Sequence, residues 1–311
     1  MYDPAALSHL ETPEPRLGWT MEDEYESLPP SASPLTHMTA GALAGIMEHT
    51  ATYPIDAIKT RMQVLRPHPT AVYYSTAHAF RSISSQEGLA KLWRGVGSVI
   101  LGAGPAHALY FASYEQVKGM LVKGEAAQSP IAVGLAGGAA TAIADAFMTP
   151  FDVVKQRMQL RGSPYSGIVA CARSILRTEG LGGFFVSYPT TLILNIPFHM
   201  IQFPVYEVTR ALLNRDNSYS PLTHVVAGGL AGGTAAFLTT PIDVIKTTLQ
   251  TRNLLDGDLR GMTEAVKILL RERGPSAFLM GAVPRALTFV PGTAICWLVY
   301  EYFKATLQSR Q

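Results

Sequence analysis

The chain has 311 residues, of which 48% are apolar and only 15% are charged. The apolar content excludes a disordered chain, and the charged fraction lies well below the roughly 25% of an ordinary soluble domain. A net charge of +2 gives no nucleic-acid-binding signature, and two cysteines are too few for a disulfide framework or a cysteine-rich zinc site.

The first 34 residues are predicted to form an acidic tail. Residues 1–30 contain seven acidic side chains and one basic side chain. A cleaved organellar presequence is rich in arginine and poor in acids, and a secretory signal needs an apolar core. We therefore expect a solvated tail, and we expect any organelle address to be internal.

Two short patterns recur three times after this tail. The pattern Pro-x-Asp-x-x-Lys begins at Pro54, Pro150 and Pro241. A second pattern, Tyr-Glu-x-x-Lys/Arg, follows each copy and begins at Tyr114, Tyr206 and Tyr300. Two triplets in step indicate three copies of one unit. We place these repeats at 35–122, 123–213 and 214–311.

Each repeat contains two apolar segments that are long enough to span a bilayer, which takes about 20 residues. They run over 35–63 and 95–122, 130–159 and 186–213, and 221–250 and 283–307. The polar stretch between paired segments predicts a short amphipathic helix, such as Ser75–Gln86. The expected fold is an all-α membrane protein with six transmembrane helices. They form three pseudo-symmetric repeats around a central cavity, with the short amphipathic helices on one side and both termini on the other.

These patterns, with Glu87-Gly88 and then Trp93-Arg94-Gly95 after the first copy, resemble the mitochondrial carrier family. The likeness covers everything after the tail. It implies a multi-pass protein of the mitochondrial inner membrane, with both termini in the intermembrane space and the short helices on the matrix side. Trp93, Arg94 and Gly95 are expected to bind cardiolipin, because free N–H groups at a helix start favour a phosphate.

The regularly placed charges predict two gates, since an ionised side chain in a membrane is costly unless it is paired. Around a threefold ring, each lysine is expected to reach the next repeat's aspartate: Lys59–Asp152, Lys155–Asp243 and Lys246–Asp56. The resemblance adds Gln63, Gln159 and Gln250 as braces of this matrix gate. The predicted cytoplasmic gate comprises Glu115, Lys118, Glu207, Arg210, Glu301 and Lys304. Gates that close in turn would alternate access to a central site; static salt bridges are the alternative.

Departures from threefold symmetry predict the substrate site. Five residues before the three prolines stand His49, Asp145 and Ala236, and eleven before the cytoplasmic-gate cations stand His107, His199 and Thr293. Imidazole and carboxylate together suit first-row divalent metals. We therefore predict metal ligands at His49, His107, His199 and Asp145, with His49 and His107 at similar depth on adjacent helices. Weaker candidates are Met47, Met200, Asn195, Cys296 and His224.

The central contact positions of the family fall here on Gly102/Ala103, Leu194/Asn195 and Thr288/Phe289. None is a cation, whereas a nucleotide or carboxylate substrate favours arginine or lysine there. Arg285, about one turn deeper, leaves a small-anion alternative open.

The stretches around His49, His107, Asn195 and Thr293 resemble the mitoferrins, the iron carriers of the family. This likeness implies transport of Fe²⁺ into the matrix for haem and iron–sulfur synthesis. The alternatives are another divalent metal (Mn, Cu or Zn), a small metabolite, or a proton leak through histidine and aspartate. We expect a monomeric transport unit without a cofactor, a nucleic-acid partner or enzyme activity.

Overall fold

The computed structural model describes residues 34–65, 73–121, 130–214, 221–252 and 261–308, and all regular secondary structure within these ranges is helical. Repeat 1 contains α2 (Pro34–Gln63), α3 (Thr76–Gln86), η2 (Leu89–Trp93) and α4 (Val96–Leu121). Repeat 2 contains α5 (Pro130–Gln159), α6 (Ile168–Glu179), α7 (Gly182–Phe185) and α8 (Tyr188–Leu213). Repeat 3 contains α9 (Pro221–Leu238), α10 (Thr240–Gln250), α11 (Met262–Arg273), η5 (Pro275–Leu279), α12 (Ala282–Leu287) and α13 (Phe289–Gln308).

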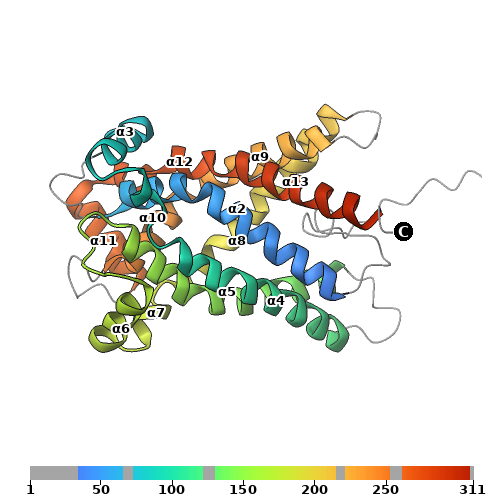
Figure 1. The fold of residues 1–311 in the computed structure, drawn as a ribbon, viewed down its shortest axis with the longest axis horizontal. Helices are drawn as coiled ribbons and strands as arrows, with labels where there is room; N and C mark the ends of the chain where they lie inside the picture. The colour runs from blue at the N-terminus through green and yellow to red at the C-terminus, as the bar shows by residue number, and fades with distance from the viewer. Residues whose placement is uncertain (1–33, 66–72, 122–129, 215–220, 253–260, 309–311) are drawn as a thin grey trace, which may run out of the picture.

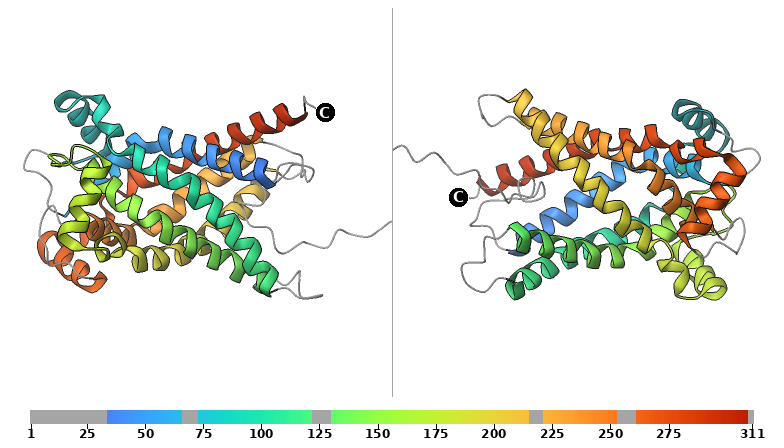
Figure 2. Two further views of the ribbon diagram at one scale, coloured as in Figure 1. Left: turned by 60° about the horizontal axis from the view of Figure 1, so that its bottom comes forward. Right: turned by 180° about the vertical axis from the view of Figure 1, so that it is seen from behind.

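The long helices run side by side along the molecule (Figure 1), and their contacts close into a ring. Contacts join α2 to α4, α4 to α5, α5 to α8, α8 to α9 and α9 to α13, and α13 packs back on α2. The short helices α3, α6 and α11 gather at one end, whereas the C-terminus lies at the other (Figure 1, Figure 2). The predicted all-α, threefold architecture is confirmed.

Three helical stretches are long and apolar enough to cross a membrane: Leu89–Tyr114, Gly182–Leu213 and Pro275–Ile295. The bent pair Leu222–Leu238 and Thr240–Gln250 is a fourth if it counts as one span. The helices α2 and α5 have 30 residues each, a length that also suffices at about 1.5 Å per residue. The count of six spans stays a prediction.

The short helices are held by three equivalent small cores. In repeat 1, Ala79 and Ile83 of α3 are buried against Ala57 and Ile58 of α2. They are four residues apart and therefore share one helix face. The predicted helix over Ser75–Gln86 is confirmed; Ser75 is its N-cap, whose side chain accepts a hydrogen bond from the backbone N–H of His78. Matching clusters hold α6 and α11, so the same contacts position the short helices in all three repeats.

Repeat 3 departs from the other two because both of its long segments are interrupted. A 68° bend at Thr239 separates α9 from α10, although one segment was predicted over 221–250. The hydroxyls of Thr239 and Thr240 bond to the carbonyls of Ala235 and Ala236, and Pro241 has no N–H. Such back-bonding together with a proline favours a bend, but α5 has the same pair at Thr149 and Pro150 and is continuous. The segment predicted over 283–307 is likewise divided, into α12 and α13.

Candidate functional site

Three lysine–aspartate pairs close the bundle near the end that carries the short helices. We call them the Asp–Lys ring: Lys59 with Asp243 at 3.0 Å, Lys155 with Asp56 at 2.6 Å, and Lys246 with Asp152 at 3.7 Å. Each lysine contacts the aspartate of the preceding repeat around the ring, so the predicted pairing with the next repeat is wrong. The sequence spacing of the lysines and aspartates is the same whether each lysine pairs with the next repeat or with the preceding one. Only the handedness of the bundle decides between these two pairings.

Two of the three predicted glutamine braces contact this ring. Gln63 donates to Asp243 at 2.8 Å, and Gln159 donates to Asp56 at 3.4 Å. The oxygen of Gln63 also accepts a hydrogen bond from Thr247 at 2.7 Å. The Gln250 side chain is buried, but neither of its amide atoms has a hydrogen-bond partner. The ring is therefore not braced equally on its three sides.

Two buried arginines, which the sequence analysis did not single out, link neighbouring repeats below the ring. Arg61 donates to the carbonyl of Gln159 at 2.7 Å, and Arg157 donates to the carbonyl of Gln250 at 2.9 Å. Repeat 3 has Thr248 at the equivalent position, and its hydroxyl bonds within its own helix. The available signal was a basic residue two positions after the ring lysine in repeats 1 and 2 only.

Each linking arginine also has a glutamate partner at the C-terminal end of a short helix. Arg61 pairs with Glu87 at 2.6 Å. Arg157 pairs with Glu179, which Arg252 also contacts at 2.8 Å. Burial by itself raises the pKa of Glu179, but the hydrogen bonds and charges of Arg157 and Arg252 outweigh it and hold the pKa below its ordinary value. Glu179 is therefore ionised in the folded protein and fixes α6 beneath the ring.

The predicted cytoplasmic gate falls largely outside the described side chains. Those of Glu115, Lys118, Glu301 and Lys304 are not among them, although their backbones belong to α4 and α13. Glu207 and Arg210 lie on α8, and the Glu207 side chain is exposed. This gate stays a prediction.

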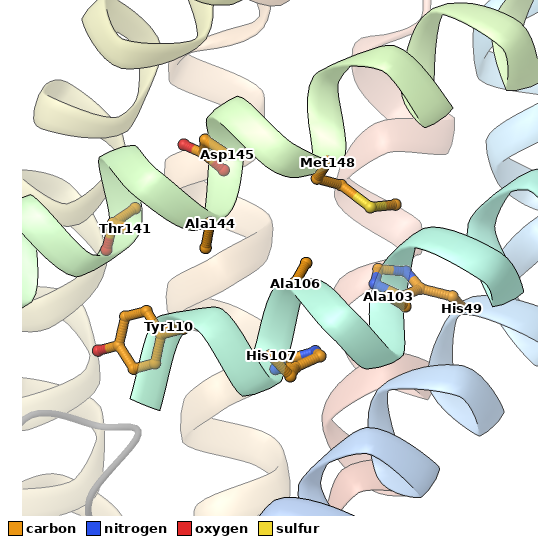
Figure 3. Close-up of a pocket in the computed structure, with 9 residues that line it drawn as sticks. All are labelled: His49, Ala103, Ala106, His107, Tyr110, Thr141, Ala144, Asp145 and Met148. Atoms are coloured by element: carbon orange, nitrogen blue, oxygen red, sulfur yellow. The ribbon is translucent and has the colours of Figure 1, made fainter. Parts of the chain in front are cut away.

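His49, His107 and Asp145 line one pocket of about 220 Å³, and they come from α2, α4 and α5 respectively (Figure 3). His107 fits here because α2 has a glycine opposite it. A Cβ atom on Gly45 would lie 2.6 Å from Nε2 of His107. The predicted placement of the two histidines on adjacent helices is therefore observed, and the sequence symmetry located three of the pocket's polar side chains.

Met148 and Tyr110 also line the pocket, and the sequence analysis did not name them. Met148 stands two residues before Pro150, where repeats 1 and 3 have Thr52 and Thr239. The same symmetry comparison, applied to that position, would have found it. A thioether thus faces the pocket from α5, close to both histidine-bearing helices.

His199 and Asn195 approach Asp145 from α8 but do not line the pocket. Asn195 donates to Asp145 at 2.6 Å. The Nδ1 atom of His199 is buried without a hydrogen-bond partner, and its ring stacks on Phe203. Within the described ranges, no three His, Cys, Asp or Glu side chains form a group that could hold a metal ion. The residues therefore present a dispersed set of donors rather than a cage.

The weaker candidate ligands with described side chains are not assembled around the pocket. The side chains of Met47 and Met200 are exposed and do not line it. Nδ1 of His224 lies 2.7 Å from the hydroxyl of Tyr206 on α8, which orients that imidazole. The Cys296 side chain lies outside the described part of the structure. The roles proposed for these four residues stay predictions.

The family model described as mitochondrial carrier protein matches residues 30–125, 126–217 and 217–311. The chain belongs to the mitochondrial carrier family. It is 46% identical to Mitoferrin-1 of Homo sapiens over 301 residues, which cover 94% of this chain and 89% of that protein. Mitoferrin-2 of Homo sapiens is 45% identical, with 93% and 81% covered. The "Mitochondrial RNA-splicing protein MRS4" of Saccharomyces cerevisiae is 43% identical, with 91% and 95% covered.

The matches confirm the resemblance that the repeated motifs indicated. As a member of the family, the chain is a mitochondrial membrane transport protein with three related repeats. The Asp–Lys ring and the pocket thus belong to a carrier.

Arg285 of this carrier has a structural role. Only 8% of its side chain is exposed. One of its terminal nitrogens donates to the carbonyl of Ala236 at 2.6 Å and to the hydroxyl of Thr239 at 2.9 Å. Its Nε lies 3.6 Å from Asp243. Arg285 is committed to protein partners, and the small-anion interpretation loses the residue on which it rested.

The candidate lipid site at Trp93, Arg94 and Gly95 is only partly available. The Arg94 guanidinium donates to the carbonyls of Ser163 and Tyr165 in repeat 2, and the Trp93 indole donates to Thr50. Gly95 has a φ of 95°, which favours glycine, and α4 starts directly after it. A lipid phosphate would therefore meet the helix start rather than the Arg94 side chain. Cardiolipin binding stays a prediction.

Proposed function

We propose that this carrier moves ferrous iron across the mitochondrial inner membrane into the matrix, where it supplies haem and iron–sulfur cluster synthesis. The observation that carries the proposal is the meeting of His49 and His107 in one pocket, with Asp145 and Met148 beside them. Neutral imidazole binds first-row metals, and a carboxylate adds the negative charge that a divalent cation favours. The similarity to two mitoferrins over more than nine-tenths of the chain supports iron as the cargo.

The dispersed donors suit a carrier rather than a storage site. Two imidazoles from different helices bind one ion only while those helices are close together. Water molecules and main-chain carbonyls would complete the coordination of the ion. Because a complete protein cage would hold the metal too tightly, an incomplete set of ligands allows release when the helices move.

The Asp–Lys ring provides the gate on the matrix side, with the short helices α3, α6 and α11 facing the matrix and both termini in the intermembrane space. The closed ring represents the state that is open to the intermembrane space. In the opposite state the ring opens and the predicted cytoplasmic gate closes, so the pocket faces each compartment in turn. The three repeats of one chain complete the ring of helices, so the transport unit is a monomer. This monomer is in contact with cardiolipin.

The membrane potential supplies the driving force without a second substrate. Each positive charge that moves toward a negative interior gains about 2.3 kcal/mol per 100 mV, so a divalent ion gains about 4.6 kcal/mol. This is enough for uniport, and no exchanged anion is needed. None of the three family contact positions carries a cation that would bind one.

A proton leak is the second candidate, because the pocket contains both imidazoles and a carboxylate that can exchange protons. Uptake into liposomes by the purified protein distinguishes the two. Saturable uptake of Fe²⁺ under reducing conditions, compared with Mn²⁺, Cu⁺ and Zn²⁺, is the expected result. Proton flux without metal flux would instead support the leak, and uptake of another metal in preference to iron would change the cargo but not the site.

A further inference from the structure

Arg285 marks a break in the threefold symmetry at the Asp–Lys ring. It stands sixteen residues before Glu301, and the equivalent positions of repeats 1 and 2 are Val99 and Thr191. Its helix, α12, packs against α9, and its guanidinium fills the bend between α9 and α10. Within the described parts of the chain, only repeat 3 therefore places a second cation next to its ring aspartate.

The three ring aspartates differ in the cations around them. Asp243 contacts Lys59 through both carboxylate oxygens, at 3.0 and 3.1 Å, and Arg285 lies 3.6 Å away. Among the described residues, the only cation within 4 Å of Asp56 is Lys155, and the only cation within 4 Å of Asp152 is Lys246. Two aspartates thus depend on one cation each, whereas Asp243 has two.

The two cations of Asp243 belong to different repeats. Lys59 and Gln63 reach it from repeat 1, across the seam between repeats 3 and 1. Arg285 shares repeat 3 with Asp243 and is tied by hydrogen bonds to Ala236 and Thr239 of the same repeat. If the gate opens by separation of the repeats, Lys59 withdraws and Arg285 remains. The carboxylate of Asp243 is then still compensated, while those of Asp56 and Asp152 lose their cations.

The same seam lacks the arginine link that joins the other repeats. Arg61 links repeat 1 to repeat 2, and Arg157 links repeat 2 to repeat 3, each through a main-chain carbonyl. Thr248 replaces this arginine in repeat 3 and bonds to Val244 of its own helix. Two independent features therefore distinguish the seam between repeats 3 and 1.

We propose that Arg285 is a positioning residue of the gate, which keeps Asp243 compensated when Lys59 withdraws, so that the seam between repeats 3 and 1 opens more readily than the other two. The inference rests on the alternating gate of the proposed function but not on the identity of the cargo. Leaving a buried charge without its partner is costly, and a second fixed cation removes most of that cost.

The test compares three equivalent lysine variants: Lys59→Gln, Lys155→Gln and Lys246→Gln. The initial rate of Fe²⁺ uptake into liposomes should fall at least tenfold further in Lys155→Gln and Lys246→Gln than in Lys59→Gln. Contact lengths alone predict another order, since Lys59 reaches both oxygens of its aspartate whereas Lys246 is 3.7 Å from Asp152. Equal losses in all three variants, or the largest loss in Lys59→Gln, would overturn the proposal.

The role of Arg285 is isolated by repeating Lys59→Gln in two backgrounds. Arg285→Val, which installs the repeat 1 residue, should make Lys59→Gln as damaging as the other two variants. Arg285→Lys keeps the charge but loses the two hydrogen bonds of the guanidinium. In this background Lys59→Gln should remain less damaging than the other two lysine variants. If the protein no longer tolerates Lys59→Gln in either background, Arg285 only supports the bend. If it still tolerates Lys59→Gln in both backgrounds, another group compensates Asp243. Either result would overturn the proposal.

Unfolding temperature in detergent provides a readout that needs no cargo. Lys59→Gln should lower it less than Lys155→Gln and Lys246→Gln do, and this difference should disappear in Arg285→Val. If the unaltered protein takes up no metal, the proposed cargo is wrong, yet this comparison still decides the role of Arg285. If Arg285→Val does not fold, the three variants with Arg285 present suffice, and equal decreases among them would overturn the proposal.

Discussion

His49 and His107 share a pocket because the residues around them are small. Gly45 on α2 leaves the space that the His107 imidazole occupies, and Ala103 and Ala106 of α4 line the pocket beside it. The close approach of the helices therefore serves the placement of polar side chains as well as packing. The chemistry of the pocket depends on these small residues as much as on the imidazoles themselves.

His49→Ala and His107→Ala should each lower the initial rate of Fe²⁺ uptake at least tenfold and leave the unfolding temperature near that of the unaltered protein. The double variant should be little worse than either single one, because both side chains would act on the same ion. His78→Ala on the short helix α3 is the matched control and should transport normally. Normal uptake by either pocket variant would show that this histidine is not a ligand.

Gly45→Ala tests whether the position of His107 matters, rather than its presence. The added Cβ would lie 2.6 Å from Nε2 of His107, so the imidazole has to move. We expect a higher KM for Fe²⁺, at least threefold, with little change in unfolding temperature, since the ring is the end of a side chain. Gly137→Ala on α5, where nothing lies within 4 Å, is the control. Equal KM values for the two variants would contradict this account.

At the scale of the helices, the Asp–Lys ring makes specific pairs, and a charge exchange tests them. Asp56→Lys alone should abolish transport, while Asp56→Lys combined with Lys155→Asp should recover part of it, because opposite charges again face each other at the same seam. The matched control combines Lys155→Asp with Asp243→Lys, the pair expected from the sequence, and should not recover. Recovery in that control would instead show that each lysine pairs with the aspartate of the next repeat.

The Glu179 contacts at the end of α6 predict a pH-dependent stability. The pKa of Glu179 is lower in the folded protein than in the unfolded chain, so its contribution is fully present above about pH 4.3, the ordinary glutamate value, and is lost as the pH falls through the folded pKa. Glu179→Gln should therefore destabilise by about 3 kcal/mol at neutral pH, because it leaves the buried Arg157 without its charge partner.

The measurement is the unfolding temperature of Glu179→Gln and the unaltered protein between pH 7 and pH 2, a range that includes the loss below about pH 4.3. The difference between them should shrink toward the acid end. The exposed Glu264 on α11 provides the control, and Glu264→Gln should show a small difference throughout. A difference for Glu179→Gln that stays constant with pH would mean that its charge is not what stabilises α6.

The sequence predicted the helices that carry the site, but it did not predict their irregularities. Two repeated patterns predicted the segments that became α2, α4, α5 and α8, because periodic apolar residues and turn residues act locally. Arg285 donates into the bend between α9 and α10, and it is distant in sequence from the carbonyl it contacts. The pairing in the Asp–Lys ring depends on handedness, which no spacing encodes. Met148 was missed because the symmetry comparison was not applied to its position.

For the whole molecule, three repeats close into one ring, but their seams are not equivalent. Arg61 and Arg157 link two seams, and the third has Arg285 beside its aspartate. The threefold frame is thus expected to provide the gate, whereas departures from it are expected to provide the cargo site and a preferred seam. An ion bound at His49 and His107 would lie by the seam-forming helix α2, which contacts both α4 and α13.

The most direct test of the account is metal uptake into liposomes under an imposed potassium diffusion potential. A uniporter of a divalent cation should accumulate Fe²⁺ when the interior is negative, with the limiting concentration ratio rising roughly tenfold per 30 mV, since two charges gain about 4.6 kcal/mol per 100 mV. His107→Ala should slow the approach to this ratio at least tenfold. Uptake that is equal at zero and at 100 mV, or an unchanged initial rate in His107→Ala, would contradict it.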